Sequence, residues 1–172
     1  MSATATALSR RPLDTVFIAF FAINFGFITY MIDIEQIVIA DPAHFTYPIW
    51  PPRFAVDLIH WWARSFDPVV WTRAPWYRAT IWIDSLVFGP FYLLAIWAFW
   101  KGKSWIRIPC FVWAGMMIAI VTIILFEELW GATPTASRGL VLGANLPWFL
   151  FPFAVIGRMR HEDPFAPSRW AA

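Results

Sequence analysis

A few polar side chains lie inside or beside segments that are otherwise apolar, and they are the residues best able to do chemistry. Asp84 lies within the run IWIDSLVFGPFYLLAIWAFW, and Asp33 ends the apolar run before it. Glu127 and Glu128 end a third apolar run, and Asn145 lies near the start of a fourth. A carboxylate is costly to place in hydrocarbon, so an acid in such a run usually faces a bundle interior and marks a functional site.

Asp33 and Asp84 are the candidate pair for that chemistry. Two carboxyl groups in a dry cavity do not both ionise easily, so they are expected to share a proton. Such a pair suits a cationic or oxygen-bearing apolar ligand. It also suits donation of a proton to a carbon–carbon double bond. Both acids are therefore candidates for ligand binding and for catalysis, and the residue pattern alone leaves the two open.

The composition indicates that the elements holding these acids lie in a membrane. Of the 172 residues, 60% are hydrophobic and 14% are charged, whereas about a quarter are charged in a typical soluble domain. The net charge of +2 does not indicate a nucleic-acid partner. The single cysteine, Cys110, cannot form an intrachain disulfide. We expect neither a metal nor a cofactor.

Four apolar segments are long enough to cross a bilayer, which takes about 20 residues. They lie near residues 15–32, 79–100, 108–126 and 139–156. Pro90 lies inside the second segment, and Pro147 and Pro152 lie inside the fourth, where we expect kinks. The sequence thus predicts an all-α membrane protein, a four-transmembrane-helix bundle that forms a single domain over residues 1–172.

Basic residues predict the orientation of the bundle. The two tails and the second loop, with Arg10, Arg160 and Arg169 among them, hold more Lys and Arg per residue than the first and third loops. The positive-inside rule therefore predicts that both termini are cytoplasmic. The membrane would be the inner membrane of a bacterium or the endoplasmic reticulum of a eukaryote.

The same topology brings the acids together. The ends of spans that carry Asp33, Asp84 and the glutamate pair all fall on the extracytoplasmic side, so we expect a shared site. Two alternatives stay open. Asp33 and the glutamates can be interfacial residues in headgroup water, and Asp84 can form a structural ion pair with Arg78 or Arg138.

The long first loop, near residues 33–78, is predicted to contain an amphipathic helix in RFAVDLIHWWARSF. One face carries Arg53, Asp57, His60 and Arg64, and the other carries Phe54, Leu58, Trp61 and Trp62. We expect this extracytoplasmic helix to lie in the interface over the bundle, with His60 on its solvated face. Asp67, which precedes Pro68, is expected to be the structural N-cap of the next helix.

Four stretches of the sequence resemble the EXPERA-domain family, and the resemblance covers about residues 13–157. They are YMIDIEQIVI (30–39), LIHWWARSFDPVVW (58–71), WIDSLVFGPFYLLAIWAFWKGKSWIRIP (82–109) and IILFEEL (123–129). The pattern is most similar to the sigma-2 receptor branch of that family. The resemblance implies a cavity in the bundle for sterol-like or amine ligands, lined by Asp33 and Asp84, with Asp67 structural.

The sterol-isomerase branch of the family implies another use of the same positions. The resemblance matches its second-helix acid to Asp84, and an Asn and a Trp to Asn145 and Trp148. That branch also has a His and a Glu on its first helix. The matching residues here are Asn24 and Ile28, which offer no proton carrier.

The sequence therefore predicts an integral membrane protein that binds sterol-like or other hydrophobic ligands, cationic ones included. The predicted ligand-binding residues are Asp33, Asp84, Asn145, Trp148, Asn24 and Glu127, and the catalytic candidates are Asp84 and Asp33. One alternative is an isomerase or related proton-transfer enzyme acting on a sterol or isoprenoid, and the other is an accessory subunit of a membrane complex. Expected partners are a lipid or sterol-like molecule, the bilayer, and a second copy or another membrane subunit.

Overall fold

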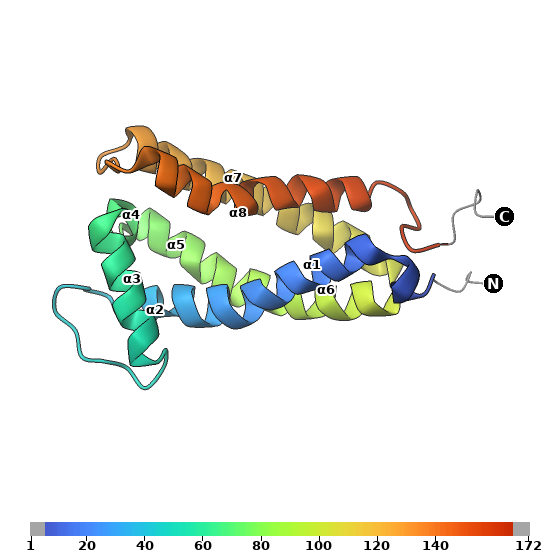
Figure 1. The fold of residues 1–172 in the computed structure, drawn as a ribbon, viewed down its shortest axis with the longest axis horizontal. Coiled ribbons are helices and arrows are strands. Elements are labelled where there is room, and N and C mark those ends of the chain that lie inside the picture. Colours follow the sequence, from blue (N-terminus) through green and yellow to red (C-terminus); the bar gives the residue numbers. More distant parts are fainter. Residues whose placement is uncertain (1–5, 167–172) are drawn as a thin grey trace.

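The computed structural model describes residues 6–166, which form helices joined by loops, with no strand in that range (Figure 1). Four helical stretches are long and apolar enough to cross a membrane: Pro12–Val38, Pro75–Lys101, Ser104–Trp130 and Arg138–Arg158. The predicted all-α, four-span fold class is confirmed. Each stretch contains one predicted span and extends beyond it at both ends. Arg169, used in the orientation argument, lies outside the described residues.

The first two spans change helix type part-way along. In the first span, α1 (Pro12–Ile23) continues as the π-helix η2 (Asn24–Asp33) and then as α2 (Ile34–Val38). In the second span, α5 (Pro75–Ile83) continues as the π-helix η3 (Asp84–Phe88) and then as α6 (Gly89–Lys101). π-Helical turns are rare and often occur at functional sites. The two candidate acids are the last residue of η2 and the first residue of η3.

The other elements are regular helices and short turns. The third span consists of the 3-10 turn η4 (Ser104–Ile106) and α7 (Arg107–Trp130), and the fourth is α8 (Arg138–Arg158). α8 continues through both Pro147 and Pro152. A short turn, η1 (Leu8–Arg10), precedes α1.

The junction between η3 and α6 shows how the second span accommodates Pro90. In π geometry the amide of Gly89 donates to the carbonyl of Asp84, five residues earlier. Pro90 has no N–H, so the next carbonyl, that of Ser85, needs another donor. The Tyr30 hydroxyl donates to it at 2.9 Å. A Cβ at Gly89 would collide with the Tyr30 ring, so glycine permits this contact between the first two spans.

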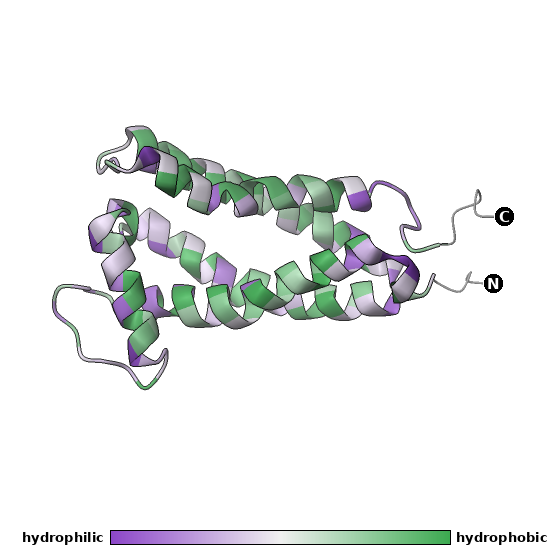
Figure 2. Cartoon of the chain, in the orientation of Figure 1, coloured by the Kyte–Doolittle hydropathy of each residue, from purple (hydrophilic) through white to green (hydrophobic). Residues whose placement is uncertain are grey.

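The spans pack as two pairs, α1 beside α6 and α7 beside α8 (Figure 1). Aromatic side chains fill the centre, where the Phe91 and Trp113 rings stack with centroids 5.5 Å apart. The amide of Thr6 donates to the carbonyl of Phe165 at 3.0 Å, so both ends of the described chain lie at one end of the bundle. Apolar residues dominate the long helices, and polar ones gather near their ends (Figure 2). Which side of the membrane the termini face stays a prediction.

The first loop covers the opposite end of the bundle with α3 (Arg53–Ser65) and α4 (Pro68–Thr72). The prediction of a helix in this loop is confirmed, but the expectation that His60 lies on a solvated face is wrong. His60 is 6% exposed, and its Nε2 lies 2.9 Å from Glu35 Oε1. Burial is possible because α2 supplies a carboxylate partner that offsets the lost hydration of the imidazole.

Two ionic clusters hold the ends of the bundle together. At the terminal end, Asp14 is bound by Arg11 and by Arg158, whose Nε lies 2.7 Å from Asp14 Oδ1. At the capped end, Glu35 accepts from Arg73 Nη2 at 2.8 and 3.0 Å. Asp14 and Glu35 are fully buried. Each carboxylate therefore has a cationic partner that links elements distant in sequence.

Candidate functional site

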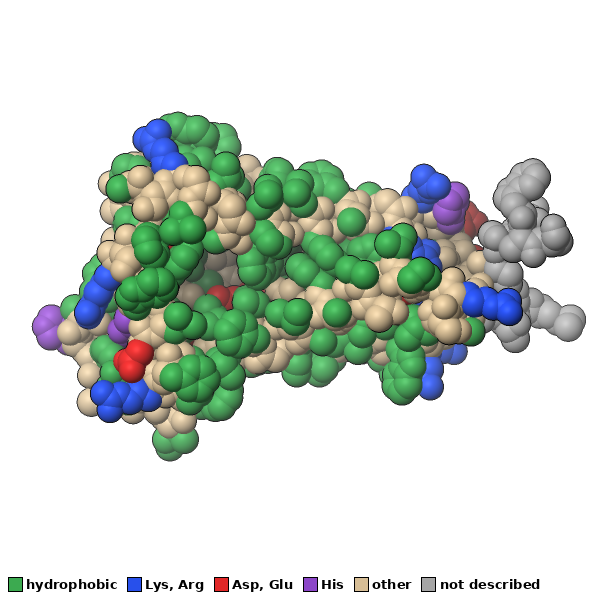
Figure 3. Space-filling model, viewed as in Figure 1, with side chains coloured by type: hydrophobic (Ala, Val, Ile, Leu, Met, Phe, Trp, Pro, Cys, Tyr) green, Lys and Arg blue, Asp and Glu red, His purple; other side chains and the backbone are tan. Residues whose placement is uncertain are grey.

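A cavity of about 370 Å³ lies inside the bundle beneath α3 and α4. Its walls come from all four spans and from the loop helices, and most of the lining side chains are apolar. The volume falls in the range of about 300–1,000 Å³ that is usual for small-molecule sites. Figure 3 shows a hollow on the long side of the molecule, surrounded by hydrophobic side chains, with an acidic side chain inside it.

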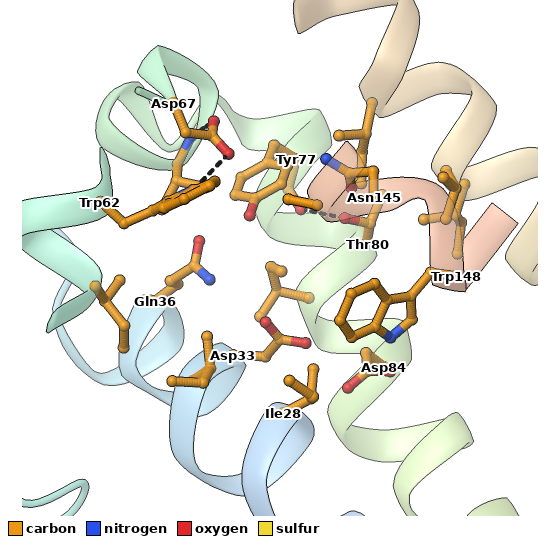
Figure 4. A pocket seen from close by; sticks show the side chains of 18 of the residues that line it. Ile28, Asp33, Gln36, Trp62, Asp67, Tyr77, Thr80, Asp84, Asn145 and Trp148 are labelled. Carbon is orange, nitrogen blue, oxygen red and sulfur yellow. Dashed lines mark hydrogen bonds between the residues drawn. The ribbon is translucent and has the colours of Figure 1, made fainter. Parts of the chain in front are cut away.

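Asp33 and Asp84 project into this cavity from facing π-helices (Figure 4). The two carboxyl groups are neighbours in the cavity. The Tyr92 hydroxyl donates to Asp84 Oδ1 at 3.4 Å, which is a long hydrogen bond. Asp84 Oδ2 is buried and has no hydrogen-bond partner among the described residues. The pair therefore retains capacity to bind a further donor.

Among residues 6–166, no salt bridge joins a cationic side chain to either of these acids. Among the described residues that line the cavity, none is Lys, Arg or His. Within residues 6–166, the salt bridges use Asp14, Glu35, Asp41 and Asp57 as acids. The alternative in which Arg78 or Arg138 pairs with Asp84 is therefore not seen. Arg78 precedes Asp84 by six residues, and that separation places the two on different faces of a helix.

A second acidic pair lies elsewhere in the cavity, where α4 begins. Asp67 Oδ1 accepts from the amide of Val70 at 3.1 Å, which is N-cap geometry, and Oδ2 accepts from Trp62 Nε1 at 3.2 Å. Burial raises the pKa of the Asp67 carboxyl, and these hydrogen bonds oppose the rise. Glu128, from α7, lines the cavity together with Asp67. Asp67 thus both caps α4 and borders the cavity.

The remaining candidate residues fall in three places. Asn145 and Trp148 of α8 line the cavity. Asn24 does not line the cavity. Its Oδ1 accepts a hydrogen bond from Trp148 Nε1 at 2.7 Å, which orients the indole. Glu127 points away from the cavity, where it accepts from the amide of Ala132 at 2.7 Å. The structure therefore places Glu128 in the cavity rather than Glu127, because successive side chains on a helix differ in direction by about 100°.

Sequence reasoning also missed three polar residues that line the cavity, namely Gln36, Tyr77 and Thr80. A signal for them was present. Tyr77 and Thr80 precede Asp84 by seven and four residues, so all three share a face of one helix. Gln36 follows Asp33 by three residues. Extending the helical period outward from the two acids would have found them.

The fold and the site define an integral membrane protein with four spans and an interior cavity that contains unpaired acids. The sequence model of the EXPERA (EXPanded EBP superfamily) family matches residues 54–159, and the chain belongs to this family. It is similar to Sigma intracellular receptor 2 of Xenopus tropicalis, with 27% identity over 133 residues that cover 76% of this chain and 72% of that protein. It is also similar to the Homo sapiens protein of that name, with 26% identity over 122 residues that cover 63% of this chain and 69% of that protein. The resemblance to the sigma-2 receptor branch is therefore confirmed.

Proposed function

We propose that the protein binds an apolar ligand, sterol-like or of comparable size, that carries a cationic amine, and that Asp33 and Asp84 hold the amine. The observation that carries this proposal is the absence of a cationic side chain among the described residues lining the cavity. The acids are held by facing helices in an apolar cavity. The similarity to proteins named as receptors supports a binding role.

The chemistry of the pair favours a cation over a neutral ligand. Carboxylates in an interior are tolerated when they are paired and hydrogen-bonded. An ammonium brings a positive charge and N–H donors, and its hydrogen bonds to carboxylates are roughly twice as strong as neutral ones. The Trp148 ring borders the same cavity and offers a face for cation–π contact. The apolar walls then receive the rest of the ligand.

The test is to replace each acid by its amide. Asp84→Asn and Asp33→Asn remove charge without changing volume, so each should weaken binding of a long-chain amine at least about tenfold. The measurement is the rise in melting temperature of the purified protein as the amine is titrated, since a ligand specific for the native state raises it. If the two acids form one site, the double variant should bind no worse than either single variant.

The matched control is Asp57→Asn, because Asp57 is an exposed acid on α3 that lies outside this cavity. This variant should bind the amine as the parent does. Parental affinity in both Asp84→Asn and Asp33→Asn would refute the proposal and leave the two acids with a structural role.

A double-bond isomerase is the second candidate, because Asp84, Asn145 and Trp148 border one cavity. Ile28 also borders it, at the position where the isomerase branch has a Glu, and it cannot carry a proton. We therefore expect the purified protein not to convert a Δ8 sterol into the Δ7 isomer. Turnover in that assay would favour the enzyme and would assign the missing proton transfer to Asp33 or Glu128.

A further inference from the structure

The second acidic pair, Asp67 and Glu128, has no role in the amine site described above. Asp67 is 4% exposed and Glu128 is 1% exposed. Figure 4 shows Asp67 at the opposite side of the cavity from Asp84. The cavity therefore has an acidic pair at each end.

Glu128 is the member of this pair that is available to a ligand. Both oxygens of Asp67 already accept hydrogen bonds, from Val70 and from Trp62. Glu128 Oε2 accepts from Asn145 Nδ2 at 3.4 Å, near the upper limit for a hydrogen bond. The same Nδ2 donates at 3.0 Å to the carbonyl of Val141, which is the better acceptor. The Glu128 side chain thus has only a weak hydrogen bond to Asn145.

Gln36 gives an independent indication of a ligand. Its side chain is 2% exposed, and its Oε1 has no hydrogen-bond partner among the described residues. In Figure 4 its carboxamide points into the cavity, between Asp67 and Asp33. Buried acceptors are nearly always hydrogen-bonded. An ammonium group bound at the Asp67 side of the cavity would supply a donor to this oxygen.

The helix α5 gives the length of such a ligand. Tyr77, Thr80 and Asp84 line the cavity along one side of the second span. In Figure 4 Tyr77 lies towards Asp67, and Asp84 lies at the other side of the cavity. The seven residues from Tyr77 to Asp84 correspond to about 10 Å of helix. This rise along the wall of the cavity is about the length of an extended eight-carbon chain, which we take as the starting length for the ligand.

We propose that the cavity takes an elongated apolar ligand with a cationic, hydrogen-bond-donating group at each end. One group binds at Asp33–Asp84 and the other at Glu128–Asp67, with the apolar middle against the walls. This inference rests on the proposed function and names the ligand class more narrowly, as a two-ended amine rather than a one-ended amine.

The experiment compares 1,8-diaminooctane with octylamine, which have the same carbon chain and differ in the second amine. Glu128→Gln should lower the affinity for the diamine about tenfold, because it removes one charge-assisted hydrogen bond. The same variant should leave the affinity for octylamine within about twofold, which also shows that its cavity is folded. Binding of both amines is measured on the purified full chain in detergent by calorimetric titration.

Glu127→Gln is the matched control, because Glu127 is the neighbouring acid and points to the loop rather than into the cavity. It should change neither affinity. Asp84→Asn should lower the affinity for both amines, and this result tests the proposed function separately. An unchanged diamine affinity in Glu128→Gln, or equal loss of both amines, would overturn the two-ended ligand. Failure of both amines to bind the parent protein would refute both proposals.

A measurement on the parent protein covers the case in which Glu128→Gln does not fold. Diamines from 1,4-diaminobutane to 1,12-diaminododecane are each compared with the monoamine of the same length. The ratio of the two affinities should peak at the middle of the series, where both ammonium groups reach an acidic pair. A ratio that is constant, or that changes steadily with length, would contradict a second site at a fixed distance.

Discussion

Four acids inside this protein fall into two groups that differ in their partners. Asp14 and Glu35, at the two ends of the bundle, each face at least one arginine. Asp33 and Asp84, in the cavity, face each other, and Asp84 keeps an oxygen with no partner among the described residues. Asp14 and Glu35 are fully buried, whereas Asp33 and Asp84 are only partly buried, so the two groups differ in burial as well as in partners.

The difference shows which acids hold the fold and which are available for binding. A carboxylate that a guanidinium already binds has little capacity for a ligand, and breaking that pair leaves an uncompensated charge. A carboxyl group without a cation contributes less to folding, and its charge becomes favourable only when a cation arrives. The paired acids should therefore determine stability, and the unpaired acids should determine affinity.

The largest expected effect separates these two groups directly. Glu35→Gln should lower the free energy of unfolding by about 3 kcal/mol, because it leaves Arg73 buried without a countercharge. Asp84→Asn should leave the stability unchanged or slightly raise it, because it removes a partly buried ionisable group that has no cationic partner among the described residues. Both are measured from unfolding curves in the same detergent. Equal destabilisation by the two changes would show that paired and unpaired acids do not differ in their contribution to stability.

A smaller effect is expected at the terminal end. Asp14→Asn should lower the free energy of unfolding by about 2 kcal/mol, which is less than Glu35→Gln, because both arginines keep other hydrogen-bond acceptors. Arg11 still donates to the carbonyl of Phe99 at 2.9 Å, and Arg158 to that of Pro164 at 2.5 Å. Amide hydrogen exchange would locate the change, with faster exchange at Thr6, which pairs with Phe165. A loss as large as that in Glu35→Gln would mean that these carbonyls provide no compensation.

The smallest effect concerns Asp67, which belongs to neither group because its partners are neutral donors. Burial raises the pKa of this carboxyl from its ordinary value of 3.8. The folded state therefore keeps a proton that the unfolded state loses above about pH 4, so this group makes stability fall as pH rises towards the raised pKa.

Asp67→Asn keeps a side-chain oxygen that can cap α4 and removes this titration. Above about pH 4 the free energy of unfolding should fall less in this variant than in the parent, by about 1.4 kcal/mol for each unit by which burial raises the pKa. Unfolding curves at several pH values measure the slope, with Asp57→Asn as an exposed-acid control. An unchanged slope in Asp67→Asn would show that the Asp67 carboxyl does not determine the pH dependence of stability in this range.

The parts of the fold that depend on residue type could be predicted from the sequence. The spans are long apolar runs, and α3 shows a clear helical period, so both follow from composition and spacing. The convergence of Asp33 and Asp84 follows from up-and-down topology, because each lies near the same end of its span. Those inferences need no knowledge of side-chain direction beyond the helical repeat.

The parts that depend on rotation or on distant contacts could not be predicted. The choice of Glu128 over Glu127 depends on how α7 is rotated, which the hydropathy of its neighbours does not define. Glu35 and Arg73 are 38 residues apart, so their pairing depends on the path of the first loop. The π-helical turns in η2 and η3 involve no unusual residue type that would reveal them.

Under the proposed function, the hollow on the long side of the bundle has a consequence for how a ligand would be supplied. In a bilayer this side faces the acyl chains, so a ligand that enters there comes from the lipid phase. Its effective concentration is then its amount dissolved in the membrane. Each added methylene favours transfer from water by about 0.8 kcal/mol, which is about a fourfold higher membrane concentration. The protein could therefore respond to traces of a greasy amine in water, because the bilayer would have concentrated the amine beside the cavity.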